Sequence, residues 1–209
     1  MSALRPPLVI VIGGATGTGK STVATEAAHR LGITRLTSTD SIRQTMRAFF
    51  SREFMPAIHY SSFEAGYAVP DADDPLTAGF IEQSRNVLVG VRASIDRALE
   101  EGWSVILEGV HLVPGLLPVH VEGAVFCPCV LSIEDETTHA QHFFTRSDGS
   151  ERPLASYLDH FAEIRRLQRF IVGRAEREGV PVIENDDAAA ATSAVIELVE
   201  AAAEAEARL

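Results

Sequence analysis

A glycine-rich segment near the N-terminus constrains the fold of this chain more than any other feature. Residues 14–21 read Gly-Ala-Thr-Gly-Thr-Gly-Lys-Ser and match the pattern G-x-x-x-x-G-K-[ST] of a phosphate-binding loop. The apolar run at residues 8–12 predicts a buried parallel strand, and a helical pattern begins at Lys20. Glycines allow positive φ angles, so consecutive backbone N–H groups can face one concavity at a helix N-terminus. The segment therefore predicts a polyphosphate site on a strand–loop–helix unit.

The side chains of this loop predict its ligands. In loops of this type the lysine, here Lys20, reaches the β- and γ-phosphates of a nucleotide, and the hydroxyl of the next residue, Ser21, ligates Mg²⁺. We therefore expect ATP and Mg²⁺ as cofactors. The alternative is a glycine-rich turn without a ligand, which the flanking strand and helix argue against. The nucleotide-binding residues predicted from this segment are Gly14, Ala15, Thr16, Gly17, Thr18, Gly19, Lys20, Ser21 and Thr22.

Length and composition indicate one globular domain. The 209 residues suffice for a single α/β domain over residues 1–209, and 18 basic against 29 acidic residues give a formal charge of −11. This charge argues against nucleic acid as a main partner, whereas a small anionic substrate depends only on local cations. The sequence has neither a signal-peptide pattern nor an apolar run of about 20 residues, so we expect a cytoplasmic protein with no membrane partner. Cys127 and Cys129 lie in an apolar segment and are expected to be packed thiols.

Acidic residues lie at the ends of two further predicted strands. Residues 33–39 predict a short strand, after which Asp40 opens a helical pattern, and residues 103–108 predict a third strand that ends in Glu108. In open parallel α/β sheets, ligands collect at the carboxyl ends of the strands. Asp40 is therefore expected to orient the acceptor, with a plain helix N-cap as the alternative. Glu108 is expected to hold a Mg²⁺-bound water.

Residues 51–78 interrupt the regular pattern with prolines and aromatic residues. They are predicted to form an insertion that covers the acceptor site. His59 within this insertion is a candidate to contact an oxyanion of the acceptor. Arg43 and His111, which lie close in sequence to the two acids, are the other acceptor-binding candidates beside Asp40. For His111, a hydrogen-bonded surface histidine is the alternative.

Residues 134–153 predict a helix and a turn that carry several basic side chains. His139, His142 and Arg146 lie in the helical part, and Arg152 follows the turn. In an acidic protein, such a group is typical of a lid that closes over phosphates, with arginine suited to bind two oxygens at once. A solvated charged face is the alternative for each residue. We expect Arg146 to act on the transferred phosphoryl group and Arg152 to bind the nucleotide.

The remaining pattern completes an alternation of strands and helices. Residues 123–133 predict a fourth strand, although Pro128 suits a central strand poorly and favours a start at or after that residue. Residues 181–184 predict a fifth strand, with Asn185 at its end, where the nucleotide base could lie. The fold class is therefore α/β, with a parallel five-stranded sheet flanked by helices and with lid and acceptor-binding insertions. Together with the phosphate-binding loop, this arrangement resembles a P-loop NTPase fold of adenylate-kinase-like type. Helices are predicted at residues 20–31, 80–99, 134–145 and 153–178, the last being the longest, and after residue 186.

Taken together, these motifs resemble the 2-phosphoglycerate kinases, a family of P-loop kinases. The run Glu-Gly-Val-His-Leu-Val-Pro-Gly at residues 108–115 is the most selective part of the resemblance. The resemblance implies transfer of the γ-phosphoryl group of ATP to the free hydroxyl of 2-phosphoglycerate, giving 2,3-bisphosphoglycerate. In two respects the sequence departs from the family: His142 stands where an arginine is expected, and the additional N-terminal regulatory module of several members is not expected here. The resemblance extends over residues 13–22, 38–43, 59–63, 108–115, 139–146, 164–168 and 180–185.

These expectations combine into one mechanism with two alternatives. The predicted catalytic residues are Lys20, Asp40, Glu108 and Arg146, acting mainly by positioning and by charge. One alternative is a P-loop kinase of another acceptor, such as a nucleoside, a sugar or a sugar nucleotide. The other is a non-catalytic nucleotide-dependent switch, which predicts slow hydrolysis without stimulation by an acceptor. The sequence leaves the oligomeric state open, with a homodimer as one alternative.

Overall fold

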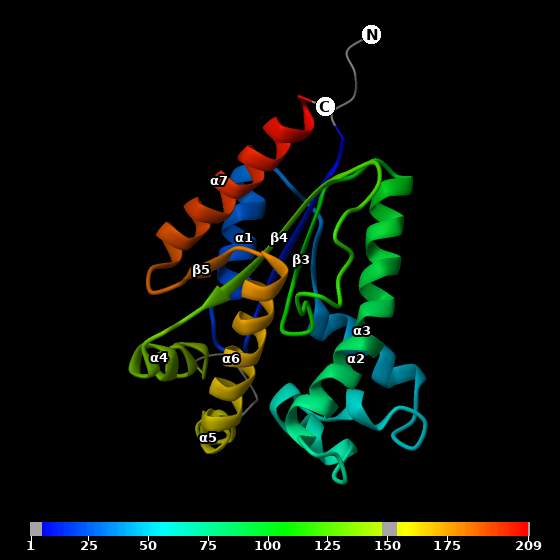
Figure 1. The fold of residues 1–209 in the computed structure, drawn as a ribbon, viewed down its shortest axis with the longest axis vertical. Helices are drawn as coiled ribbons and strands as arrows, with labels where there is room; N and C mark the ends of the chain where they lie inside the picture. Colours follow the sequence, from blue (N-terminus) through cyan, green and yellow to red (C-terminus); the bar gives the residue numbers. More distant parts are fainter. Residues whose placement is uncertain (1–5, 148–153, 209) are drawn as a thin grey trace.

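The computed structural model describes residues 6–147 and 154–208 and contains a five-stranded parallel sheet in the order β2-β3-β1-β4-β5 (Figure 1). Pairing aligns Ser38 of β2 and Ile12 of β1 with Glu108 of β3, so the carboxyl ends of these strands meet at one edge. The predicted five-stranded parallel sheet is confirmed. The strands are β1 (Leu8–Gly14), β2 (Leu36–Ser38), β3 (Val105–Glu108), β4 (Val125–Ser132) and β5 (Val182–Glu184).

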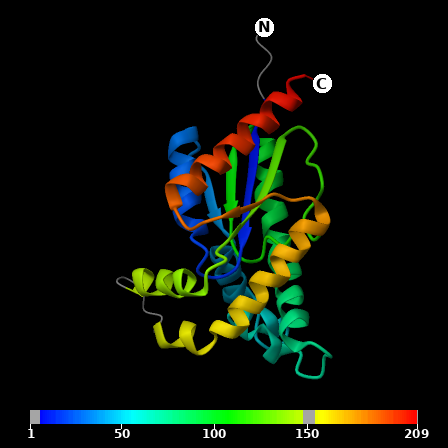
Figure 2. The same ribbon diagram turned by 60° about the vertical axis from the view of Figure 1, so that its left-hand side comes forward.

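Helices cover both faces of this sheet because its strands alternate two sets of apolar side chains. Ile10 and Ile12 of β1 pack against α1 and α7, whereas Val9 and Val11 pack against α3. Figures 1 and 2 show α1 and α7 on one side of the sheet and α3 on the other. The helices are α1 (Lys20–Leu31), α2 (Thr39–Phe49), α3 (Pro75–Glu100), α4 (Glu136–Ser147), α5 (Leu154–Asp159), α6 (Phe161–Glu178) and α7 (Ala188–Glu206).

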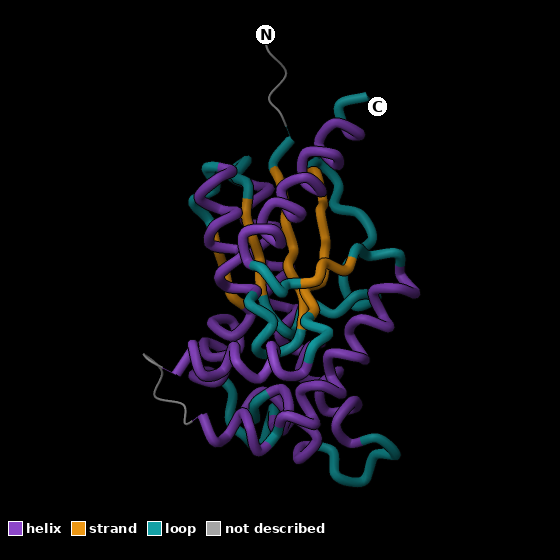
Figure 3. The backbone as a smooth tube through the Cα atoms, turned by 90° about the vertical axis from the view of Figure 1, so that its left-hand side faces the viewer, coloured by secondary structure: helices purple, strands orange, loops and turns teal. Residues whose placement is uncertain are grey.

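The shorter elements gather at the carboxyl end of the sheet, where Figure 3 shows helices and loops below the strands. The insertion predicted at residues 51–78 contains two 3₁₀ helices, η1 (Pro56–His59) and η2 (Ser62–Ala68). It ends earlier than predicted, because Asp74 caps α3 by accepting a hydrogen bond from the Thr77 amide (3.2 Å). Among the described helices, none is both long and apolar enough to cross a lipid bilayer.

Pro128 lies within β4, so the prediction that this strand starts at or after the proline is wrong. The amide of Val130 donates to Pro181 on the β5 side of the strand (2.9 Å). Because successive residues of a strand point their amides to opposite sides, the Pro128 nitrogen also faces the β5 side. Pairing with β5 begins only at Val130, opposite Val182. The missing N–H therefore falls where the described sheet has no neighbouring strand.

The prediction of a single long helix at residues 153–178 is also wrong, because α5 and α6 are separate helices. In a continuous helix the amide of His160 would donate to the Ser156 carbonyl. Instead the ring Nδ1 of His160 lies 2.9 Å from that carbonyl, and His160 has the φ and ψ angles of −109° and 21° of a helix cap. The longest described helix is α3, with 26 residues.

Candidate active site

The phosphate-binding loop joins β1 to α1 and requires glycine at two positions. Gly17 and Gly19 have φ angles of 86° and 77°, in the left-handed region that side chains disfavour. A Cβ atom at Gly19 would lie 2.2 Å from Nδ2 of Asn185, and one at Gly17 would lie 2.5 Å from the Phe143 ring. Both the backbone angle and the closeness of the neighbouring elements therefore exclude a side chain here.

Lys20 lies at the mouth of this loop, buried to 8% exposure. Its Nζ donates to the Ala15 carbonyl (2.6 Å) and lies 3.4 Å from Oγ1 of Thr18. The Thr18 hydroxyl donates to the same Ala15 carbonyl (3.0 Å). These bonds hold the ammonium group beside the glycine-rich backbone, between two cavities.

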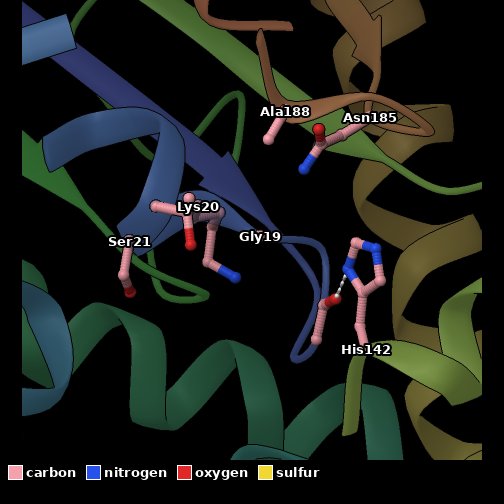
Figure 4. A pocket seen from close by; sticks show the side chains of 8 residues that line it. Gly19, Lys20, Ser21, His142, Asn185 and Ala188 are labelled. Atoms are coloured by element: carbon pink, nitrogen blue, oxygen red, sulfur yellow. Dashed lines mark hydrogen bonds between the residues drawn. The ribbon is translucent and has the colours of Figure 1, made fainter. Parts of the chain in front are cut away.

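The larger cavity has a volume of about 480 Å³ and opens on the α7 side of the loop (Figure 4). This volume lies within the range of pockets that hold nucleotide-sized ligands. Asn185, 1% exposed, donates from Nδ2 to the Thr18 carbonyl (2.8 Å) and thereby ties the end of β5 to the loop. The lining residues are Gly17, Gly19, Lys20, Ser21, Thr22, His142, Asn185 and Ala188.

The smaller cavity has a volume of about 120 Å³ and lies at the carboxyl ends of β2 and β3. Within it the Ser21 hydroxyl donates to Oε1 of Glu108 (3.1 Å), and Glu108 is 6% exposed. Asp40 enters the cavity from the first turn of α2. Ser38, whose Oγ accepts from the Ser41 amide (3.1 Å), is the N-cap of that helix, so Asp40 is not the cap. The lining residues are Thr16, Lys20, Ser21, Ser38, Asp40, Glu108, Gly109 and Val110.

Arg43 connects Asp40 to the insertion. Its Nε and Nη2 donate to Oδ1 of Asp40 (3.3 Å each), and its Nη1 donates to the carbonyls of Ile58 and Tyr60 (3.0 Å each). The residue is 3% exposed and does not line either cavity. The guanidinium thus holds the Asp40 carboxylate and the backbone of the insertion, and its direct contact with the acceptor stays a prediction.

Two predicted acceptor-binding histidines lie away from the smaller cavity. His111 is fully buried, and its ring nitrogens lie 2.8 Å from Oγ1 of Thr39 and 3.0 Å from Oε1 of Gln83. Burial lowers the pKa of His111 to about 4, so the ring is neutral near pH 7. The expectation that His111 contacts the acceptor is wrong, because both nitrogens are occupied in the core. His59 bonds the Phe50 carbonyl through Nε2 (2.9 Å) and does not line the smaller cavity.

Helix α4 contacts the phosphate-binding loop through two histidines. Nε2 of His139 lies 2.8 Å from the Thr16 carbonyl, and Nδ1 of His142 lies 3.0 Å from the Gly17 carbonyl. Because a carbonyl only accepts, His139 donates from Nε2, and its Nδ1 then accepts from Arg165 (3.3 Å). Burial lowers the pKa of His139 to about 4. The interpretation of His139 as a cation of the lid is therefore wrong: it is a neutral bridge from α6 to the loop.

The predicted lid arginines fall at the limit of the described part of the chain. Arg146 belongs to the last turn of α4, but its side chain lies outside the described residues. Arg152 lies wholly outside them. Their roles at the phosphates stay predictions.

Several residues around this site are not among the predicted site residues. Gln83 lies three residues after Phe80 on the buried face of α3, and both are fully buried. An amide at a core position of an amphipathic helix is a signal of a buried hydrogen bond, which sequence reasoning could have used. Ser62 of η2, whose Oγ lies 3.4 Å from Oγ1 of Thr16, brings the insertion against the loop. Arg165 lies within the resemblance at residues 164–168, but its position on the flank of a helix does not predict the contact with His139.

Comparison with known proteins finds similar sequences with a named activity. No protein-family model matches the chain. The 2-phosphoglycerate kinase of Methanothermobacter thermautotrophicus is 41% identical over 201 residues, covering 92% of this chain and 65% of the relative. That of Methanocaldococcus jannaschii is 43% identical over 183 residues, covering 87% and 59%. The chain thus spans less than two thirds of the length of these curated relatives.

Solved structures agree on the fold. Shikimate kinase from Acinetobacter baumannii, in complex with shikimate, matches with a TM-score of 0.55 at 15% identity, covering 95% of this chain and 96% of that one. A gluconokinase from Sinorhizobium meliloti matches with a TM-score of 0.52 at 16% identity, covering 96% and 95%. At this identity the likeness establishes the architecture alone. The sequence similarity goes further: over most of its length this chain is similar to 2-phosphoglycerate kinases.

Proposed function

We propose that this protein is an ATP- and Mg²⁺-dependent kinase that phosphorylates a hydroxyl of a small anionic acceptor, 2-phosphoglycerate, giving 2,3-bisphosphoglycerate and ADP. The observation that carries the proposal is that Lys20 and Ser21 line both cavities. A nucleotide in the larger cavity and an acceptor in the smaller one would meet at these two side chains. The names of the curated relatives support 2-phosphoglycerate as the acceptor.

The reaction needs positioning and charge more than covalent chemistry. The oxygen of the acceptor hydroxyl forms a bond to the γ-phosphorus, and the bond from that phosphorus to the oxygen retained by ADP breaks. Asp40 accepts or orients the proton of the acceptor hydroxyl. Lys20 neutralises charge on the transferred group, and Arg146 and Arg152 are proposed to do so from the lid.

Ser21 and Glu108 form a fitting site for Mg²⁺. Their hydroxyl and carboxylate oxygens lie 3.1 Å apart, and oxygen donors of this kind are those that Mg²⁺ prefers. Ser21 would hold the ion directly and Glu108 through a water. Bound there, Mg²⁺ supplies charge neutralisation for the phosphates.

The size of the smaller cavity supports a small acceptor over a nucleoside. Its volume of about 120 Å³ lies well below the roughly 300 Å³ at which drug-sized ligand pockets begin. The lining contributes hydroxyl groups, one ammonium and two carboxylates, which suits the hydroxyl groups of a small acceptor more than an aromatic base.

A product assay tests the proposal. ADP formation would be measured with ATP and Mg²⁺ against 2-phosphoglycerate, 3-phosphoglycerate, glycerate and nucleosides, with identification of the phosphorylated product. We expect turnover of 2-phosphoglycerate and its loss in Lys20→Ala. Turnover of another acceptor alone would make the protein a kinase of that acceptor, and slow hydrolysis without stimulation by any acceptor would indicate a nucleotide switch. Full turnover in Lys20→Ala would refute the assigned site.

We also propose a cytoplasmic location, which the two buried free thiols support because reducing compartments preserve them. A homodimer is kept as the alternative to a monomer. Sedimentation equilibrium with and without nucleotide distinguishes the two.

A further inference from the structure

Three fully buried polar side chains, Gln83, His111 and Thr39, form a hydrogen-bonded chain behind the smaller cavity. They belong to α3, to the loop after β3 and to the first turn of α2. Oε1 of Gln83 lies 3.0 Å from Nε2 of His111, and Nδ1 of His111 lies 2.8 Å from Oγ1 of Thr39. Buried polar groups that satisfy one another in this way define one arrangement of the elements that carry them.

The partners of Gln83 determine the direction of every bond in this chain. Nε2 of Gln83 donates to the carbonyls of Ala57 (2.6 Å) and Tyr60 (3.0 Å) in the insertion, so Oε1 faces His111. His111 therefore donates from Nε2 to that oxygen. The neutral ring then accepts at Nδ1, and the Thr39 hydroxyl is the donor. The chain thus begins at the backbone of the insertion and ends on α2.

The end of this chain lies directly beside the proposed acceptor-orienting acid. Thr39 is the first residue of α2, and Asp40 is the next. The loop after β3 also packs closely against Thr39: a Cβ atom at Gly109 would lie 1.8 Å from Oγ1 of Thr39. A displacement of Thr39 would therefore displace Asp40 relative to Glu108.

A second connection reaches Asp40 from the same segment of the insertion. The Tyr60 carbonyl accepts from Gln83 and also from Arg43 (3.0 Å), and Arg43 bonds Oδ1 of Asp40. Residues 56–60 are thus connected to Asp40 along two routes, one through Arg43 and one through His111. The first route holds the carboxylate, and the second holds the backbone that carries it.

From this arrangement we infer that His111 is a positioning residue, which sets the place of the Asp40 carboxylate in the smaller cavity by joining α2 to residues 56–60 through Thr39 and Gln83. The inference rests on the proposed function, since it assigns Asp40 to the acceptor. It predicts that breaking the chain slows transfer to the acceptor and leaves nucleotide binding intact, because none of the three residues lines the larger cavity.

Single substitutions separate the two bonds of His111. His111→Gln keeps a donor for Gln83 and removes the acceptor for Thr39, whereas His111→Asn does the reverse. Thr39→Val removes the hydroxyl without changing the side-chain shape, and Thr39→Ser keeps it. Gln83→Leu breaks the chain farthest from Asp40. His29→Asn, at an exposed histidine of α1, is the matched control.

Steady-state kinetics with 2-phosphoglycerate and binding of a fluorescent ATP analogue test the inference. We expect kcat to fall about 10- to 100-fold in His111→Gln, His111→Asn and Thr39→Val, as for a catalytic group displaced by about 1 Å. The ATP-analogue Kd should stay within about twofold in each. Thr39→Ser and His29→Asn should retain wild-type kcat. The double variant Thr39→Val/His111→Gln should be no slower than the slower single variant, since both changes remove the same bond.

Other results would overturn the inference. Unchanged kcat in folded Thr39→Val and His111→Gln would do so, as would a higher KM for the acceptor at constant kcat, which indicates direct binding. Backbone amide NMR gives a readout that does not depend on activity: Gln83→Leu should shift the Asp40 resonance, and an unmoved resonance would refute the coupling. If the wild-type protein phosphorylates none of the acceptors, the proposed function fails and the NMR result alone decides the coupling.

Discussion

Protonation of the buried His111 makes the stability of this protein depend on pH in a defined direction. Burial lowers the pKa of His111 from 6.5 to about 4; the charge of Asp40 opposes this shift, and those of Arg43 and Lys20 add to it. The unfolded chain has the ordinary pKa, so between pH 4 and 6.5 it binds more protons than the folded protein. The stabilisation is therefore fully present above about pH 6.5 and is lost as the pH falls toward about 4.

The two pKa values determine the size of this effect. At about 1.4 kcal/mol for each pKa unit, the difference between 6.5 and about 4 amounts to about 3 kcal/mol over the whole range. About 2 kcal/mol of this is lost between pH 7 and pH 5, where most carboxylates stay ionised. The pKa of His139 is also lowered to about 4, so the wild-type protein loses stability from both residues. A variant at His111 alone separates the contribution of His111 from that of His139.

Urea unfolding at pH 7 and pH 5, monitored by the fluorescence of the single tryptophan, Trp103, measures the effect. Glutamine does not titrate, so the free energy of unfolding should fall about 2 kcal/mol less in His111→Gln than in the wild-type protein between these pH values. His29→Gln, at an exposed histidine, should behave like the wild-type protein. Equal losses in His111→Gln and the wild type would show that His111 is not buried in its neutral form, and the reasoning would be wrong.

Three further predictions follow from individual contacts. Gly17→Ala should abolish nucleotide binding, because the φ angle of Gly17 is 86° and the new Cβ would lie 2.5 Å from the Phe143 ring. The control Gly32→Ala has a φ angle of 67° but open space around the Cβ, so it should lose only about 1 kcal/mol of stability. Equal losses of nucleotide binding in the two variants would contradict the clash with Phe143. Asn185→Ala should raise the Kd of an ATP analogue about fivefold by removing the bond to the Thr18 carbonyl, and an unchanged Kd would count against a role for that bond. Burial raises the pKa of Cys127 to about 11 and also raises the pKa of Cys129. Iodoacetamide at about pH 8 should therefore label neither thiol before the protein unfolds. Rapid labelling of the native protein, detected by mass spectrometry, would disprove this prediction.

Local patterns in the sequence account for most of the fold and for the nucleotide side of the site. The apolar run before Gly14, the glycines of the loop and the periodicity from Lys20 to Leu31 predict a strand, a loop and a helix that the structure confirms. Strand ends could likewise be predicted, and with them the meeting of Ser21, Asp40 and Glu108 at one cavity. These inferences succeed because each depends on the order of elements and on the parallel arrangement of the sheet.

Long-range hydrogen bonds decided the cases in which sequence reasoning was wrong. Pro128 is tolerated inside β4 because β5 pairs with that strand only from Val130 onward. The His160 ring interrupts a pattern that looks like one continuous helix. Neither the extent of a neighbouring strand nor the partner of a side chain is encoded in the periodicity of the segment itself.

The histidines show most clearly the difference between what the sequence determines and what the tertiary structure determines. From sequence, His111 is a candidate ligand and His139 a candidate cation, since both lie beside residues expected at the phosphates. Tertiary structure instead gives each ring two hydrogen-bond partners from distant elements and removes it from water, which keeps it neutral. The sequence by itself thus determines which chemical groups stand near the site. Their charge and their role depend on burial and on partners that only the folded chain brings together, because desolvation decides which protonation state is stable.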